Sequence, residues 1–455
     1  MTVLEARPTA ARRKAWSAPR SADATTILAI FAALQFVLPS RLVLNYLPLS
    51  MSPASAVALG LGTLWLCTQM STTLGAAKGR SPVRTMLFAY SCVLVASYAS
   101  SAMSHLDADE RGLADTTMVR VFALVFVGLA ACDGIRSLDR IYFLLRVVVV
   151  CTTVVAVFGI LQYLAGFDVT PFMRFPGLHF WEQTNSVGVR NGLTRAAGTT
   201  SNPLEFGVFC AMILPLAIHA ALHAKREGRR IAPWWACVAL MSAGLMFSVS
   251  RSAIIGVAAA SFALFLGWPA RRRLWMAATG GGFVALIGIA APGLLNTFRS
   301  LFQDAGQDSS VQWRLHDYDT GRQLIAQHFW LGRGTGTWYA PKHEIFDNQY
   351  LLTLVESGVL GLVTFVGIFL AGLYAAVRVR FLWSRGPQAS THDRDLPLSL
   401  AASLCVIFPA FATFDFLAFP TVSATAFLLT GIAGALLRVA RAEAAGEARD
   451  PHALV

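Results

Sequence analysis

Charged side chains are scarce in this sequence of 455 residues. Asp, Glu, Lys and Arg make up only 14% of it, whereas soluble domains carry about 25%. Hydrophobic residues reach 55%, and the mean hydropathy is +0.56. Apolar runs of roughly 17 to 25 residues recur along the chain, and each is long enough to cross a bilayer. The composition excludes an ordinary soluble protein and predicts an all-α polytopic membrane protein.

Cysteine is confined to the apolar segments or their edges. The seven cysteines are Cys67, Cys92, Cys132, Cys151, Cys210, Cys237 and Cys405. This placement favours neither a disulfide framework nor a cysteine metal cluster. No cleavable signal peptide is visible, because the first apolar run follows a basic low-complexity tail that is predicted to be disordered.

The apolar runs predict about twelve transmembrane helices. They lie near residues 24–44, 52–70, 84–103, 117–133, 141–166, 202–223, 232–249, 252–268, 274–296, 348–376, 397–414 and 419–437. The two termini and five connecting segments, such as HAKREGRR and PARRRL, hold the majority of the 37 Lys and Arg residues. With twelve crossings, the two termini and the five connecting segments all lie on the same face of the membrane. The positive-inside rule predicts that this face is cytoplasmic. We expect these basic segments to contact anionic lipid. This explains the net charge of +12, so the charge does not indicate binding to nucleic acid.

The predicted organisation has five parts. They are a disordered cytoplasmic tail (1–23), transmembrane helices 1–9 with an outer loop at 167–201 (24–296), a large extracytoplasmic loop (297–347), helices 10–12 (348–437) and a second cytoplasmic tail (438–455). Long loops between packed spans tend to be functional. In the large loop, apolar residues at helical spacing predict a surface helix that roofs a cavity. This face comprises Val311, Leu315, Tyr318, Arg322, Ile325 and Phe329. Arg322 either snorkels to the membrane surface or points into the cavity.

Arginines on the outer face are the strongest chemical signal. Arg190 and Arg195 lie in the first outer loop, Arg251 lies in a short hairpin between two spans, and Arg314 lies in the large loop. Guanidinium groups bind phosphate oxygens bidentately and keep their charge, so several around one pocket suit a diphosphate. The alternative is that each one contacts lipid headgroups. Just after Arg195, the residues Asn202, Pro203 and Glu205 have the pattern of a helix start.

The segment FDNQYLLTLVESGVLGL, residues 346–362, places two carboxylates in an apolar helix. Gln349, Thr353 and Glu356 fall on one face of that helix. Glu356 is therefore either a functional residue facing a cavity or a buried partner in a hydrogen bond or ion pair, for instance with Arg120 or Arg146. Gly358 and Gly361 favour close helix packing over binding.

Four segments occur in the order RAAGTTSNPLEFGVF, SVSRSAIIG, WRLHDYDTGRQLIAQHFWLGRGTGTW and DNQYLLTLVESGVLGL. Over about residues 195–362 the sequence thereby resembles the O-antigen ligase and polymerase superfamily (Wzy-type). The resemblance implies a GT-C-like fold in the bacterial plasma membrane, with an active site on the extracytoplasmic face. It also implies an undecaprenyl-diphosphate-linked glycan donor and a saccharide acceptor. By family analogy, a chain-length regulator and a flippase are further partners.

One position departs from the ligase pattern. Ligases typically carry His-Asn, then nine other residues, then Gly-x-x-Gly. Asn348, Gly358 and Gly361 keep that spacing, but Asp347 replaces the His. Asp at this position is similar to polymerase-like members, and His343 lies out of register. The resemblance therefore implies a polymerase of O-antigen, capsule or exopolysaccharide, with a ligase as the alternative. Asp347 would orient or deprotonate the acceptor hydroxyl, or else merely cap the helix.

The residue patterns and the resemblance together predict the following site. The expected catalytic residues are Asp347, Arg251 and Arg195, and the expected substrate-binding residues are Arg314, Arg190, Arg322, Asn348, Glu356 and His343. We expect catalysis without a cofactor or metal. The DxD tripeptide Asp317-Tyr318-Asp319 is a pattern that can bind a divalent cation. The pattern also occurs at Asp393-Arg-Asp395, so it is weak evidence for a metal site. We interpret the acids of Asp317-Tyr318-Asp319 as exposed residues of a helix.

Two other classes of function remain open. A transporter or flippase of lipid-linked sugars would show repeat-related polar helices, which are not evident. A peptidoglycan polymerase of the shape, elongation and division type is the other alternative, although the four segments fit the O-antigen group better.

Overall fold

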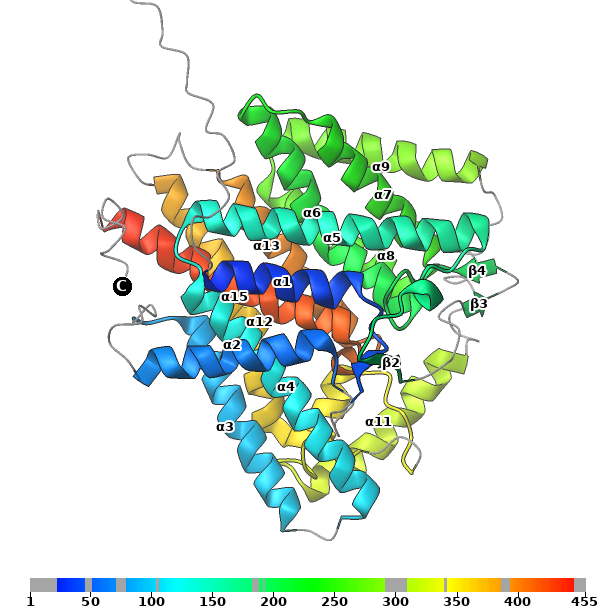
Figure 1. Cartoon of the computed structure of the whole chain (residues 1–455), viewed down its shortest axis with the longest axis vertical. Coiled ribbons are helices and arrows are strands. Elements are labelled where there is room, and N and C mark those ends of the chain that lie inside the picture. The colour runs from blue at the N-terminus through cyan, green and yellow to red at the C-terminus, as the bar shows by residue number, and fades with distance from the viewer. Residues whose placement is uncertain are drawn as a thin grey trace, which may run out of the picture.

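The computed structural model describes residues 23–45, 51–70, 79–103, 106–181, 188–190, 193–290, 309–338, 342–385 and 393–445. Within these ranges the chain is mostly helical (Figure 1). The first half contains α1 (Ala24–Val37), α2 (Pro53–Met70), α3 (Pro82–Ala102), α4 (Ala108–Gly134), α5 (Leu138–Ala165), α6 (Pro203–Arg226) and α7 (Ala232–Phe247). The second half contains α8 (Arg251–Gly267), α9 (Ala270–Ala290), α11 (Ser309–Gln327), α12 (Gln349–Arg385), α13 (Asp395–Cys405), α14 (Ile407–Phe411) and α15 (Pro420–Ala444).

Among the residues that the structure describes, six helices are long and apolar enough to cross a membrane. These are α3, α4, α5, α6, α12 and α15, and shorter apolar helices occupy α1, α7, α8 and the α13–α14 segment. The chain is therefore a membrane protein. Every predicted span coincides with at least one helix, whereas the twelve crossings, their orientation and the five-part organisation remain predictions.

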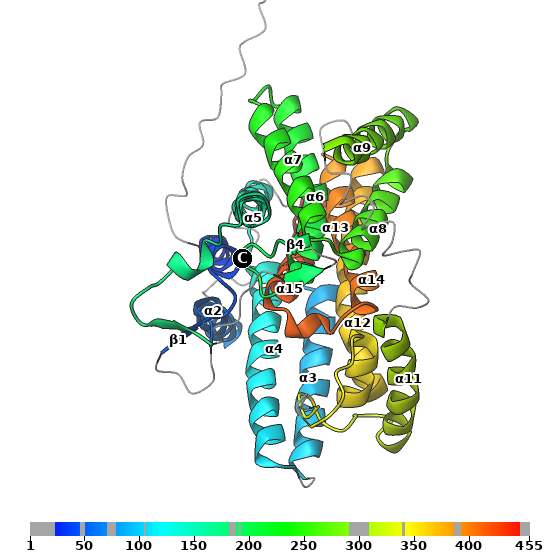
Figure 2. The same cartoon turned by 90° about the vertical axis from the view of Figure 1, so that its right-hand side faces the viewer.

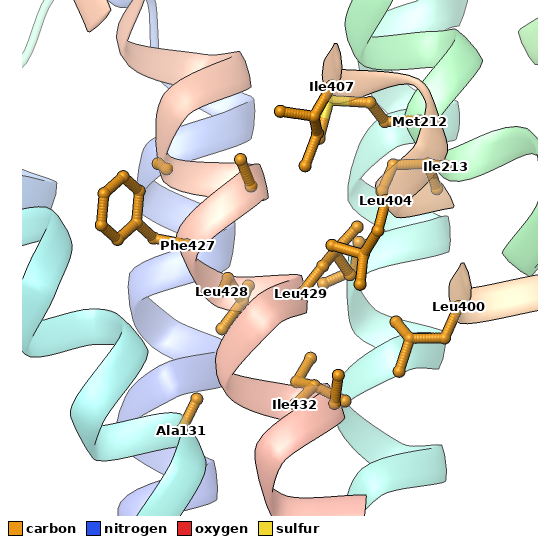
Figure 3. Packing of buried hydrophobic residues seen from close by; sticks show 14 of the residues in the cluster. Ala131, Met212, Ile213, Leu400, Leu404, Ile407, Phe427, Leu428, Leu429 and Ile432 are labelled. Carbon is orange, nitrogen blue, oxygen red and sulfur yellow. The ribbon is translucent and has the colours of Figure 1, made fainter. Parts of the chain in front are cut away.

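Helix α15 forms the centre of the bundle and packs against α4 and α12. Almost all of its apolar stretch is buried, and Figure 3 shows Phe427, Leu428, Leu429 and Ile432 surrounded by side chains of α4, α6 and α13. A Cβ at Gly431 would lie 2.5 Å from the Gly128 carbonyl oxygen of α4. Small residues thus let the two helices approach closely. Because lipid is as apolar as the side chains, helices in a membrane associate through such van der Waals packing and not through the hydrophobic effect.

Strands are the main departure from the all-α prediction. β1 (Leu42–Leu44) pairs with β2 (Leu178–Phe180), and β3 (Gly188–Arg190) pairs with β4 (Leu193–Arg195), both antiparallel. The first predicted span, 24–44, is therefore too long: α1 ends at Val37, just before Pro39, and β1 follows. A proline interrupts a helix because it lacks an amide N–H and restricts the residue before it.

The predicted span at 117–133 begins too late, because the acidic residues before it form the start of α4. Asp107 and Glu110 make a capping box there, so the helix begins at Ala108. At the other end of the chain, α15 continues to Ala444, beyond the predicted boundary at residue 437. The predicted disordered tail at 1–22 lies outside the described residues.

Candidate active site

The start of α12 is capped by Asn348. Its Oδ1 accepts hydrogen bonds from the backbone N–H groups of Tyr350 (3.0 Å) and Leu351 (3.2 Å). Asp347 lies one residue earlier and is half-buried. The alternative in which Asp347 caps the helix is therefore wrong. Asp and Asn are equally good caps, and the sequence does not show which of two neighbours takes that position.

A cavity of about 540 Å³ opens between the start of α12 and α11. The two helices lie side by side at one end of the molecule (Figure 2). The cavity is lined by Tyr318, Asp319, Arg322, Ile325, Asn348, Tyr350, Leu351, Leu354 and Ala412. The predicted helix with a face on a cavity is thus confirmed for Tyr318, Arg322 and Ile325. Of the two alternatives for Arg322, the structure favours the one in which it faces the cavity.

The other residues of the predicted face of α11 are not among the described residues that line the cavity. The side chains of Val311, Arg314 and Leu315 lie outside the described residues, and so does that of Arg190 in β3. Phe329 follows the end of α11 and is exposed. In the DxD tripeptide, Asp319 is exposed as predicted, but Asp317 is buried, at 3% exposure. Residues two apart on a helix point in different directions, so these acids do not form a pair.

Arg195 and Arg251 are brought together by one tight turn. Arg195 Nε donates a hydrogen bond to the Ser248 carbonyl oxygen (3.1 Å), and Arg251 begins α8 three residues later. Between them, the buried Val249 has a φ of 47°. A β-branched residue at positive φ is strained, and such strain persists only where the surrounding structure enforces it.

Close packing behind the turn supplies that constraint. A Cβ at Gly207 of α6 would lie 2.4 Å from Ser248 Oγ and 2.7 Å from Ala253 Cβ. The glycine therefore lets α6 lie directly against the turn. The two predicted arginines are positioned by the same rigid contact.

The position of Arg251 relative to the cavity follows from the packing of α8. Gly256 contacts Val406, while Gly267 at the other end of α8 contacts Leu398, so α8 runs antiparallel to α13 and α14. Five residues correspond to about 7.5 Å of helix. Arg251 is accordingly level with the end of α14.

Asp415, which is not among the site residues expected from the sequence, also belongs to this region. It lies between α14 and the 3-10 helix η2 (Phe416–Ala418), and the Leu417 N–H donates to Gln349 Oε1 of α12 (2.8 Å). Burial and the negative charge of Asp347 raise the pKa of Asp415 to about 7. The one available signal was an acid in the otherwise apolar segment FATFDFLAF between the last two spans.

The model of the O-antigen ligase family matches residues 236–366. The resemblance to the O-antigen ligase and polymerase superfamily is confirmed. The matched stretch contains Arg251, α11 and the start of α12, while Arg195 and Asp415 lie outside it. No curated protein matches the chain. The family implies a glycosyl-transfer enzyme of the O-antigen ligase kind, acting on a lipid-linked glycan in a membrane.

Within the matched stretch, α12 is broken at Gly358, which has φ 67° and ψ −168°. The loop after α11 fills the break: Gly334 N–H donates to the Glu356 carbonyl oxygen, and Val359 N–H donates to that of Phe329, both at 2.9 Å. A Cβ on Gly358 would lie 2.4 Å from the Trp330 carbonyl carbon. The packing partner of Gly358 is a loop and not a second helix, so the predicted close packing of helices is wrong at this residue.

Glu356 is held by that same loop. Its Oε1 accepts a hydrogen bond from the Trp338 backbone N–H (3.4 Å). An ion pair with Arg120 or Arg146 is not found among the described residues, and Glu356 is not among the residues that line the cavity. The structure favours the hydrogen-bonding alternative. The rest of the predicted polar stripe is present, since Gln349 Nε2 donates to Thr353 Oγ1 (3.0 Å).

His343 lies in an ionic cluster that joins the large loop to α4. Its Nε2 is 2.9 Å from Glu110 Oε1 and 2.7 Å from Arg333 Nη1, and its ring stacks on Trp338. The buried Glu110 also pairs with Lys342 (3.2 Å). His343 is likewise not among the residues that line the cavity. Its predicted role in substrate binding stays a prediction, and its contacts favour a role in fixing the loop.

Proposed function

We propose that the protein is a polymerase that joins oligosaccharide repeat units carried on undecaprenyl diphosphate, on the outer face of the plasma membrane. The observation that carries this proposal is the cap of α12. Because Asn348 satisfies the helix start, Asp347 remains available at the position where ligases carry a histidine. Asp347 also lies directly beside a residue of the cavity wall.

The reaction is a group transfer at an anomeric carbon. The hydroxyl oxygen of an acceptor repeat unit attacks this carbon and forms the new glycosidic bond. The bond from the carbon to the diphosphate oxygen breaks, and its electron pair leaves with undecaprenyl diphosphate. The hydroxyl proton passes to the Asp347 carboxylate, which acts as the general base.

Arg195 and Arg251 stabilise the leaving group. Negative charge grows on the diphosphate as its bond to the sugar breaks, and fixed positive charges placed in advance lower that barrier. The hydrogen bond from Arg195 to the turn that precedes Arg251 supports a joint role. In this proposal Arg190 and Arg314 assist in donor binding.

The cavity between α11 and α12 accepts the incoming sugar. Tyr318, Asp319, Arg322 and Asn348 supply hydrogen-bonding groups, and the remaining wall is apolar. A mainly apolar pocket with a few convergent polar groups is the usual form of a small-molecule site. Asp347 stands at its edge, where the acceptor hydroxyl would meet the donor.

A single-substrate assay tests this proposal. Purified protein receives only an undecaprenyl-diphosphate-linked repeat unit, and the products are separated by size. A ladder of multiples, absent with Arg251→Ala and Asp347→Asn, is the expected result. The ligase alternative predicts no ladder but transfer to an added lipid or protein acceptor. Absence of any transfer would favour the transporter alternative.

A further inference from the structure

Two histidines and an aspartate meet at the opposite end of α12 from the candidate active site. His219 and His223 lie one turn apart on α6, and Asp393 lies just before α13. His219 Nε2 and His223 Nδ1 are each 2.9 Å from the same atom, Asp393 Oδ2. The unbroken part of α12 after Gly358 is roughly 40 Å long, so this cluster is remote from Asp347.

The Asp393 carboxylate is fixed with one oxygen toward the histidines. Its Oδ1 accepts hydrogen bonds from Arg226 Nη1 (2.5 Å) and from the Asp395 backbone N–H (3.1 Å). Arg226 also pairs with the Asp395 carboxylate, to which Arg272 adds a second ion pair at 2.8 Å. The two arginines are thus balanced by two carboxylates, and Asp393 Oδ2 remains directed at the imidazole rings.

The two imidazole rings are held by their neighbours. Tyr142 of α5 stacks on His223, with ring centroids 4.4 Å apart, and on His219 at 6.0 Å. His219 is 4% exposed, and the Asp393 side chain is 9% exposed. A set of ligands in a fixed and largely buried arrangement needs little reorganisation when it binds an ion.

The ring nitrogens of His223 face two carboxylates. Nδ1 is turned toward Asp393, and Nε2 is 3.1 Å from Glu227 Oε1. A neutral imidazole carries only one N–H, so it cannot donate to both. If Nδ1 binds a metal ion, Nε2–H donates to Glu227, which is the carboxylate–histidine–metal arrangement common in metalloproteins. Glu227 is itself fixed by Arg229 Nε at 2.7 Å.

We propose that His219, His223 and Asp393 bind one divalent transition-metal ion of the zinc class. Two imidazole nitrogens and one carboxylate oxygen suit Zn²⁺, with water as the fourth ligand. The three ligand atoms lie within 4.8 Å of one another, and small side-chain rotations would bring them to the metal–ligand bonds of about 2.0–2.2 Å that Zn²⁺ requires. The ion would tie α6 to the start of α13 and stabilise this end of the bundle.

A metal titration of the full-length protein in detergent tests the proposal. The protein is purified without a polyhistidine tag, treated with a chelator and titrated with Zn²⁺, and bound zinc and the melting temperature are measured. One zinc per chain and a higher melting temperature are expected. His219→Gln and His223→Gln should lose both effects, while Glu227→Gln should weaken binding by about 10- to 100-fold. His179→Gln, which alters an exposed histidine on β2, is the matched control.

Two results would overturn the proposal. If wild-type protein binds no stoichiometric zinc, the cluster is held by hydrogen bonds and ion pairs alone. If wild type and a His219→Gln/His223→Gln variant bind the same amount of zinc per chain, the metal binds at another site. If that double variant does not fold, visible absorption of Co²⁺ in wild type and in Glu227→Gln reports the ligands directly.

Discussion

Asn348 Nδ2 donates a hydrogen bond of 3.0 Å to the Tyr318 hydroxyl, which joins α12 to α11 across the cavity. The same side chain caps α12 through its other terminal atom, Oδ1. One residue therefore fixes both the start of one helix and the position of the other. The shape of the cavity depends on this contact.

Tyr318→Phe should weaken substrate binding without affecting the helix cap. Loss of one hydrogen bond costs about 1 kcal/mol, which corresponds to roughly a five-fold change in an equilibrium constant. We expect KM for the lipid-linked substrate to rise several-fold with little change in kcat, measured by steady-state kinetics. Tyr374→Phe, at an exposed position on α12, is the matched control. Equal effects of both substitutions would contradict the assigned contact.

Asp347→Asn should abolish activity while the protein remains as stable as wild type. Loss of a general base lowers the rate by about 10²- to 10⁴-fold, and the helix keeps its cap at Asn348. Asn348→Ala should instead lower stability by about 1 kcal/mol, because it removes the cap. Initial rates and thermal unfolding of both variants separate the two roles. A loss of stability in Asp347→Asn that matches Asn348→Ala would show that Asp347 is structural.

Arg251→Ala should reduce kcat by about 10²- to 10³-fold, the usual cost of removing one group that stabilises transition-state charge. Arg251→Lys should recover only part of this loss, since an ammonium keeps the charge but not the bidentate geometry. Turnover of the lipid-linked donor is the measurement. Arg271→Ala, at an exposed arginine of α9, should behave like wild type. A similar loss there would indicate a general effect of surface charge.

Asp415 should make stability depend on pH. Burial and the charge of Asp347 raise its pKa from 3.8 to about 7, so between these values the folded state binds a proton that the unfolded state has lost. This contribution to stability is complete below pH 3.8 and disappears as the pH rises through 7. Asp415→Asn stays neutral, so its stability relative to wild type should increase from pH 5 to pH 8.

Melting temperatures across this pH range test the prediction for Asp415. Asp139→Asn, which removes an exposed carboxylate on α5, serves as the control for a change in net charge. A pH-independent difference between Asp415→Asn and wild type would refute the assignment of the raised pKa to Asp415.

Gly358→Ala should destabilise the protein. The added Cβ would lie 2.4 Å from the Trp330 carbonyl carbon, and φ of 67° is strained for alanine. We expect a cost of at least about 1–3 kcal/mol in the free energy of unfolding, measured by denaturation in detergent. Gly280→Ala is the control, because it lies within α9 with open space around it. It should be neutral or stabilise the helix by up to about 1 kcal/mol.

The sequence alone located the helices and the chemistry on them. The lengths of the apolar runs identified twelve segments, and each of them contains a helix. In lipid, an apolar run can pair its own backbone N–H and C=O groups only by forming a helix. The start of α6 was also predictable, because the cap at Asn202 and the first-turn Pro203 are adjacent in the sequence. Arg195 and Arg251 stood out because basic residues are otherwise concentrated in the segments assigned to the opposite face.

Only the tertiary structure decided which residues meet. The raised pKa of Asp415 depends on Asp347, 68 positions earlier, and Asp393 reaches His219 across 174 positions. The break at Gly358 depends on backbone groups of the preceding loop. Contacts of this kind leave no periodic pattern in a sequence, because they are set by how helices pack and where loops fold back. The amino-acid sequence thus determined the helices and their charged residues, and packing determined the site.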